Sequence, residues 1–166
     1  MLCCKKIWMV LALLAVSGFA SANESSFNYS FSYPKSWKMI ETPNAGVYLL
    51  APKTEVEDFR PNIVVQVKPA DKKNNLKYYS RSFENSLKEN NSSTDIETIK
   101  TENIAGKNSQ SIDYFINRAG SVIQGRAYLF EIENRVMIIN CTANDLQFEK
   151  IAPVFENIVD SFTSEG

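Results

Sequence analysis

Histidine does not occur anywhere in the 166 residues, and this absence excludes much familiar enzyme chemistry. Histidine is the commonest general base, proton carrier and zinc ligand in proteins. Without it, the chain cannot assemble a Ser-His-Asp or a Cys-His catalytic arrangement. A glycine-rich phosphate loop is also missing, because Gly106 and Gly125 stand alone in the sequence. We therefore expect a protein that is not an enzyme and that needs no cofactor.

Long hydrophobic runs are also lacking, apart from one near the N-terminus. A positive start at Lys5 and Lys6, an unbroken apolar run at residues 7–16 and small residues before Asn23 are the three parts of a signal peptide. The apolar run is too short for a membrane-spanning helix, which needs roughly 20 residues. We expect residues 1–22 to be cleaved during export from a bacterial cell. Residues 23–166 then form one domain, periplasmic or extracellular, without a membrane anchor.

Cysteine is scarce, and one thiol remains after this cleavage, at Cys141. A single cysteine cannot form an intramolecular disulfide, so stability must come from the hydrophobic core. Cys141 alternates with Met137 and Ile139 on one face of a predicted strand. A thiol among apolar groups has a raised pKa and low reactivity. We expect Cys141 to be a core residue rather than a nucleophile.

No charge of either sign dominates the exported chain. After loss of Lys5 and Lys6 it has 16 basic and 19 acidic residues, a net charge of −3. This balance does not favour binding to nucleic acid or to an anionic membrane.

Three acidic residues come close together at Glu55, Glu57 and Asp58, as the oxygen ligands of a hard cation would. Their spacing matches no calcium loop. Lys53 and Arg60 beside them favour a solvated, mutually neutralising loop, and metal binding there stays an open alternative. A hydrolase that uses carboxylates alone would have its best candidate site in the same loop.

Alternation of apolar and polar residues predicts a mostly β structure. The first predicted strand alternates Phe27, Tyr29, Phe31 and Tyr33 with polar residues, which is typical of a strand with one face on a core. Further strands are predicted at residues 37–40, 46–51, 62–68, 95–101, 110–117, 122–131 and 135–142. Turn residues near Gly120 and at 133–134 join the last three as hairpins, so these strands must be antiparallel.

Two segments change to the period of a helix. In each, apolar residues recur three and four apart, as on one helix face. They are Leu76, Tyr79, Phe83 and Leu87 in the first segment, and Phe148, Ile151, Phe155, Ile158 and Phe162 in the second. Asn144 or Asp145 is the candidate N-cap of the second helix, but Pro153 would interrupt it, so we expect regular helix to begin near Ala152. The predicted class is α+β, an antiparallel sheet with helices packed on its faces.

The order of these elements resembles the PsbP/Mog-like superfamily, which includes the DcrB-like exported proteins of bacteria. The resemblance rests on the Tyr33-Pro34-x-x-Trp37 turn after the first strand, the strand, helix and meander order, and a final helix ending at residues 158–162. It implies a sandwich of sheet and helices over nearly all of the exported chain. DcrB-like members are often lipoproteins, whereas this signal lacks a lipid-accepting cysteine after its apolar run. Superfamily members include photosystem accessory subunits, small-GTPase binders and secretion chaperones, so the resemblance implies binding or assembly without one partner.

The predicted strand at residues 122–131 carries the candidate partner-binding face: Gln124, Arg126, Tyr128 and Phe130. Arginine and aromatic side chains together are enriched at protein interfaces. In the alternative interpretation, Arg126 pairs with a cross-strand carboxylate such as Asp113 and the aromatic residues fill a second core layer, since a sheet between helices needs both faces covered.

Trp37 is the single tryptophan of the exported chain. It either fills one end of the core or stacks on a ligand.

Together, these features predict an exported, non-enzymatic accessory protein that binds another protein or peptide. The alternative is a small-molecule or lipid carrier with a pocket between the sheet and the first helix.

Overall fold

The seven-stranded sheet at the centre of the computed structural model is antiparallel throughout, in the order β2-β3-β4-β8-β7-β6-β5. Its strands are β2 Lys38–Thr42, β3 Gly46–Leu50, β4 Asn62–Pro69, β5 Thr94–Ile104, β6 Lys107–Arg118, β7 Ser121–Ile132 and β8 Arg135–Asn144. The structure describes residues 29–42, 46–53, 59–91, 93–104, 106–118 and 120–164. The predicted signal peptide and the loop with Glu55, Glu57 and Asp58 lie outside the described residues.

At the centre of the sheet, two strands that are distant in the sequence pair with each other. Strands β5 to β8 form a meander, and β4 then pairs with β8, with Val65 opposite Ile139. The seven predicted segments from residue 37 onward are all strands, and the α+β class with an antiparallel sheet is confirmed.

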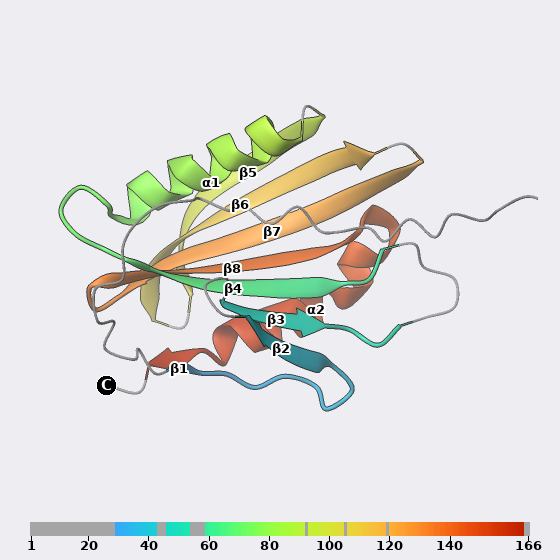
Figure 1. Ribbon diagram of the computed structural model, residues 1–166, viewed down its shortest axis with the longest axis horizontal. Coiled ribbons are helices and arrows are strands. Elements are labelled where there is room, and N and C mark those ends of the chain that lie inside the picture. The colour runs from blue at the N-terminus through green and yellow to red at the C-terminus, as the bar shows by residue number, and fades with distance from the viewer. Residues whose placement is uncertain are drawn as a thin grey trace, which may run out of the picture.

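Two helices cover opposite faces of this sheet (Figure 1). Helix α1, Leu76–Asn90, contacts β5, β6 and β7, and α2, Asp145–Asp160, contacts β7 and β8. Successive residues of β7 show the division. Leu129 packs in a cluster with Leu76 of α1, whereas its neighbour Phe130 packs with Phe148 of α2. Side chains alternate between the faces of a strand, so one strand supplies both core layers.

Helix α2 begins earlier than the position of Pro153 suggested. Asn144 is its N-cap, with Oδ1 accepting a 3.1 Å hydrogen bond from the Leu146 N–H, and Pro153 lies inside the helix. The expected start near Ala152 was therefore wrong. Pro153 is exposed, so its ring faces away from the core. A helix bends away from a proline on its outer face, and the apolar inner face stays packed on the sheet.

The predicted first strand is much shorter than its alternation indicated. Within the described residues, it is β1, Tyr29–Ser30, which pairs with β9, Thr163–Ser164, instead of joining the large sheet. Tyr29, Phe31 and Tyr33 still pack against the core, and the rings of Phe31 and Phe162 stack with centroids 4.5 Å apart. The alternation thus reflects an aromatic layer beside the end of α2 rather than an extended ladder.

Cys141 is fully buried on β8, as expected for a core residue. Burial raises the pKa of its thiol well above the usual value. In the described part of the chain, no helix has both the length and the apolar character needed to cross a membrane.

Candidate functional site

An ion pair between neighbouring strands lies at the centre of the candidate site. Asp113 of β6 and Arg126 of β7 are directly opposite one another in the ladder, and Arg126 Nε donates to Asp113 Oδ1 at 2.5 Å. Asp113 is 6% exposed, whereas Arg126 keeps more contact with solvent. The cross-strand pair considered from the sequence is therefore present. Removing a carboxylate from water is costly unless it is paired, so the position of each residue depends on the other.

Three further groups hold the guanidinium of Arg126 in place. Its Nη1 lies 3.5 Å from Glu156 Oε1 on α2, and its Cζ lies 6.0 Å from the ring centre of Phe148. Burial lowers the pKa of Arg126, but hydrogen bonds with Asp113 and Tyr128 outweigh this effect and the net pKa is raised. Arg126 is therefore a fixed cation between the sheet and α2.

A cavity of about 270 Å³ opens beside this pair, between β5, β6 and β7 on one side and α2 on the other. Its polar walls include Lys100 and Glu102 of β5 and Glu156 and Asp160 of α2. The cavity thus combines both charge signs around one fixed arginine.

Ser111 also lines the cavity, and the residue is 3% exposed. Ser109, two residues earlier on the same strand face, donates to the Glu102 carbonyl at 2.8 Å. A hydroxyl can both donate and accept, so Ser111 can bond to a group that enters the cavity. The sequence did not predict a role for either serine. Ser109, Ser111 and Asp113 alternate with apolar residues such as Ile112 and Tyr114, and this pattern is typical of a strand whose polar face meets solvent.

The four residues of the predicted partner-binding face differ in how deeply they are buried. Tyr128 and Phe130 are buried in the core cluster beneath α2, and Phe130 is 1% exposed. Gln124 and Arg126 are half-buried and keep contact with solvent. Tyr128 still lines the cavity wall, and burial raises the pKa of its phenol above the usual range. The part of the face that a partner can reach is therefore its polar part.

Trp37 lies in the core rather than in a binding cleft. Its ring meets Phe155 edge-on, with centroids 6.1 Å apart, and the residue is 7% exposed. This position corresponds to the core-plug interpretation, and little of the ring is accessible to a stacking ligand.

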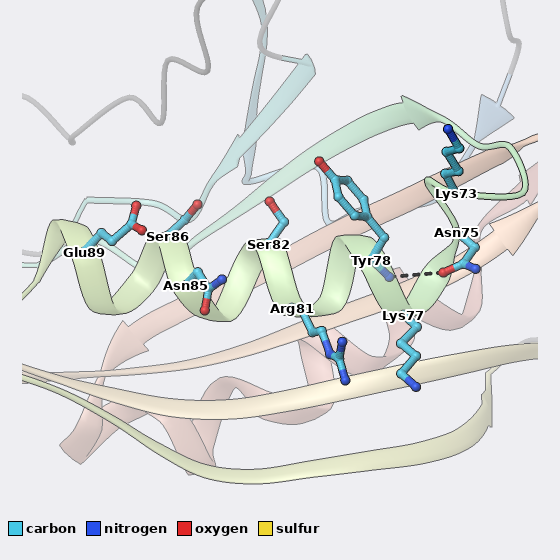
Figure 2. Close-up of a pocket in the computed structure, with 9 residues that line it drawn as sticks. All are labelled: Lys73, Asn75, Lys77, Tyr78, Arg81, Ser82, Asn85, Ser86 and Glu89. Carbon is cyan, nitrogen blue, oxygen red and sulfur yellow. Dashed lines mark hydrogen bonds between the residues drawn. The ribbon is translucent and has the colours of Figure 1, made fainter.

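A second cavity, of about 580 Å³, follows the outer surface of α1 (Figure 2). Its lining residues are Lys73, Asn75, Lys77, Tyr78, Arg81, Ser82, Asn85, Ser86 and Glu89. All belong to α1 or to the loop before it, so the described walls come from one side only. Figure 2 shows Lys77 and Arg81 projecting away from Tyr78 and Ser82 around the helix. This arrangement is an open helix surface, and we place the candidate site at the Arg126 cavity.

No cluster of three or more histidine, cysteine, aspartate or glutamate side chains suited to a metal ion occurs among the residues that the structure describes. The Arg126 cavity presents charged side chains from Lys100, Glu102, Arg126, Glu156 and Asp160.

The fold is an α+β sandwich of the PsbP/Mog-like class, which confirms the resemblance in the sequence. A family model described as PsbP-like protein matches residues 20–164, so the chain belongs to the PsbP-like family. No curated protein sequence matches the chain.

Solved structures share this fold at low sequence identity. LpqN of Mycobacterium tuberculosis, involved in cell envelope biogenesis, aligns with a TM-score of 0.65 at 13% identity over 84% of each chain. Cyanobacterial PsbP from Synechocystis gives 0.63 at 12% identity over 90% of this chain and 98% of that chain. The Saccharomyces cerevisiae Ran-binding protein Mog1p gives 0.56 at 11% identity over 83% and 96%.

Proposed function

We propose that the protein is an exported accessory protein that binds another protein or peptide at the Arg126 cavity and catalyses no reaction itself. The observation that carries this proposal is the cavity between β5–β7 and α2, with Ser111 and the ion-paired Arg126 among its lining residues. A polar group of a partner that enters the cavity gains both a hydrogen bond and charge complementarity.

Two independent features support export and protein binding. Residues 1–22 have the composition of a signal peptide, and LpqN, which shares the fold, is involved in cell envelope biogenesis. Mog1p, with the same fold, is a Ran-binding protein. A shared fold does not transfer a partner, so the proposal rests on the cavity of this chain.

The space between the sheet and α1 argues against the carrier alternative. Leu76 of α1 packs there with Ile112 of β6 and Leu129 of β7, both of which are 0% exposed. A carrier pocket at this position would require these side chains to separate. The apolar interior on this side is occupied by the protein itself.

Site-specific photo-crosslinking in the native compartment tests the proposal. A photoreactive amino acid at Asp160, on the rim of the cavity, should yield an adduct of defined mass in periplasmic extract. The same probe at Glu89 of α1, on the opposite face of the sheet, is the matched control and should not yield this adduct.

Dependence on the cavity then distinguishes binding from chance capture. The adduct at Asp160 should weaken when Ser111→Val removes a hydroxyl from the cavity lining. An adduct formed equally at Glu89, or one unaffected by Ser111→Val, would contradict the proposed site.

A further inference from the structure

The second half of β5 is a sheet edge that no described strand covers. β5 is the last strand of the large sheet, and no other strand pairs with its outer side in the described part of the chain. Its first residues alternate between half-buried and exposed, whereas the five residues 99–103 are all exposed, and Ile99 is 46% exposed. These side chains remain exposed although Lys100 and Glu102 line the cavity that faces α2. A long open edge presents unpaired backbone N–H and C=O groups that can accept another strand.

The regular part of this edge is centred on Thr101. A register shift between Ile96 and Thr98 interrupts the ladder with β6, and the strand ends at Ile104. The uninterrupted segment is thus residues 98–104, whose middle residue is Thr101. If two such segments pair antiparallel along their full length, Thr101 lies opposite its own copy.

Charge placement around Thr101 fits this register independently. Lys100 and Glu102 flank Thr101 and point to the same face of β5, because each is two residues from the other. Neither side chain forms an ion pair with a described residue. In the register centred on Thr101, Lys100 of one copy lies opposite Glu102 of the second, and symmetry repeats the pair. Directly opposed side chains of antiparallel strands have Cβ atoms roughly 5 Å apart, within reach of an ion pair.

We propose that a second copy of this chain docks on β5, forming a twofold-symmetric dimer through antiparallel pairing of residues 98–104 with two reciprocal Lys100–Glu102 contacts. Such a self-complementary edge gives a closed twofold interface rather than a growing fibre. One strand pair buries less than the roughly 1,200 Å² of a standard interface, so the dimer belongs to the weak class. This interface goes beyond partner binding at the Arg126 cavity and requires no other molecule.

Sedimentation equilibrium of the purified protein, from about 10 µM to about 1 mM, tests the dimer because weak interfaces dissociate in this range. Wild-type protein should show a reversible monomer–dimer equilibrium. Lys100→Glu and Glu102→Lys each place two like-charged pairs in the interface and should raise the dimer Kd at least about tenfold. The combined Lys100→Glu/Glu102→Lys chain restores both pairs with exchanged positions and should recover the wild-type Kd within about threefold.

Lys150→Glu and Glu149→Lys on α2 are the matched charge controls, because both residues are exposed and distant in sequence from β5. Neither should change the Kd, and circular dichroism should confirm that all variants are folded. A wild-type protein that is monomeric at every concentration would overturn the proposal. A dimer that withstands both single reversals would overturn it too.

A cysteine at the symmetry centre gives a second readout. In a chain with Cys3 and Cys4 replaced by serine, Thr101→Cys should form an intermolecular disulfide under mild oxidation, because residue 101 faces its own copy. Cys141 is buried and does not compete. Glu97→Cys, at the register shift outside the paired segment, should cross-link much less, and equal cross-linking at both positions would contradict the register.

Discussion

The hydroxyl of Tyr114 on β6 donates a 2.8 Å hydrogen bond to Oδ1 of Asn140 on β8, passing across the intervening strand β7. The residue of β7 directly opposite Tyr114 is Gly125, and the aromatic ring occupies the space where a side chain would start. Burial raises the pKa of Tyr114 far above its usual value, so the phenol stays protonated and remains a donor. Three strands are therefore linked through one ring.

Gly125→Ala should destabilise the protein by about 1–3 kcal/mol, because the added Cβ would overlap the Tyr114 ring. Urea denaturation followed by tryptophan fluorescence measures this change in the free energy of unfolding. Tyr114→Phe is the companion variant and should cost about 1 kcal/mol, since it removes the hydrogen bond but keeps the ring. If Gly125→Ala is as stable as wild type, the ring does not require the glycine.

Arg126→Met should destabilise the protein by about 2–3 kcal/mol, because it leaves the buried Asp113 carboxylate without its partner. The double variant Arg126→Met/Asp113→Asn should regain a large part of this loss, since no unpaired charge remains. A double-mutant cycle in urea, completed with Asp113→Asn alone, gives the coupling energy, expected to be at least about 1 kcal/mol. A coupling near zero would mean that the two residues act independently.

Pro153→Ala should stabilise α2 by about 1 kcal/mol or more. Proline inside a helix lacks the N–H that would donate to the carbonyl four residues earlier, and alanine restores this bond. Thermal unfolding measures the change, with exposed Lys150→Ala on the same helix as the control, expected to change stability by less than about 0.5 kcal/mol. A lower melting temperature for Pro153→Ala would contradict this expectation and show that Pro153 favours the packing of α2 on the sheet.

The folded protein should lose stability above about pH 9, near the ordinary Cys pKa of 9.0. The folded chain keeps the Cys141 proton where the unfolded chain has released it, so unfolding releases a proton and becomes easier as pH rises. Tyr114 and Tyr128 add to this loss above their ordinary pKa of 10.0, because burial raises the pKa of both. Measured by urea denaturation at a series of pH values, Cys141→Ala should delay the onset to about pH 10. An unchanged onset would contradict the role of the thiol.

Local patterns in the sequence predicted most of the fold, because the order of apolar and polar residues in each strand reflects which side chains are buried. The alternation of Ile123, Ala127 and Leu129 with Arg126 and Tyr128 on β7 corresponds to the two core layers beneath α1 and α2. Local residue patterns do not indicate which distant strands pair with each other. Nothing in the neighbourhood of Val65 indicates that it lies beside Ile139, and only the assembled sheet brings β4 and β8 together.

The candidate site was predictable in part. The opposed Asp113 and Arg126 could be matched because a short hairpin fixes the register between their strands. The cavity could not be predicted, because it depends on where Glu156 and Asp160 of α2 lie over the sheet. The start of α2 was predicted wrongly because proline is expected to interrupt a helix. That expectation does not include the packing energy of the apolar helix face on the sheet.

The ladder between β1 and β9 brings Tyr29 beside Ser164 and Ser30 beside Thr163. The outermost described parts of the chain, 135 positions apart in sequence, are therefore neighbours, and the Oγ of Ser30 and Oγ1 of Thr163 lie 2.9 Å apart. A circular permutant that joins these two ends with a short linker and opens the chain at the β6–β7 hairpin turn would retain every rung of the large sheet. The path of the backbone through this domain is nearly a closed ring.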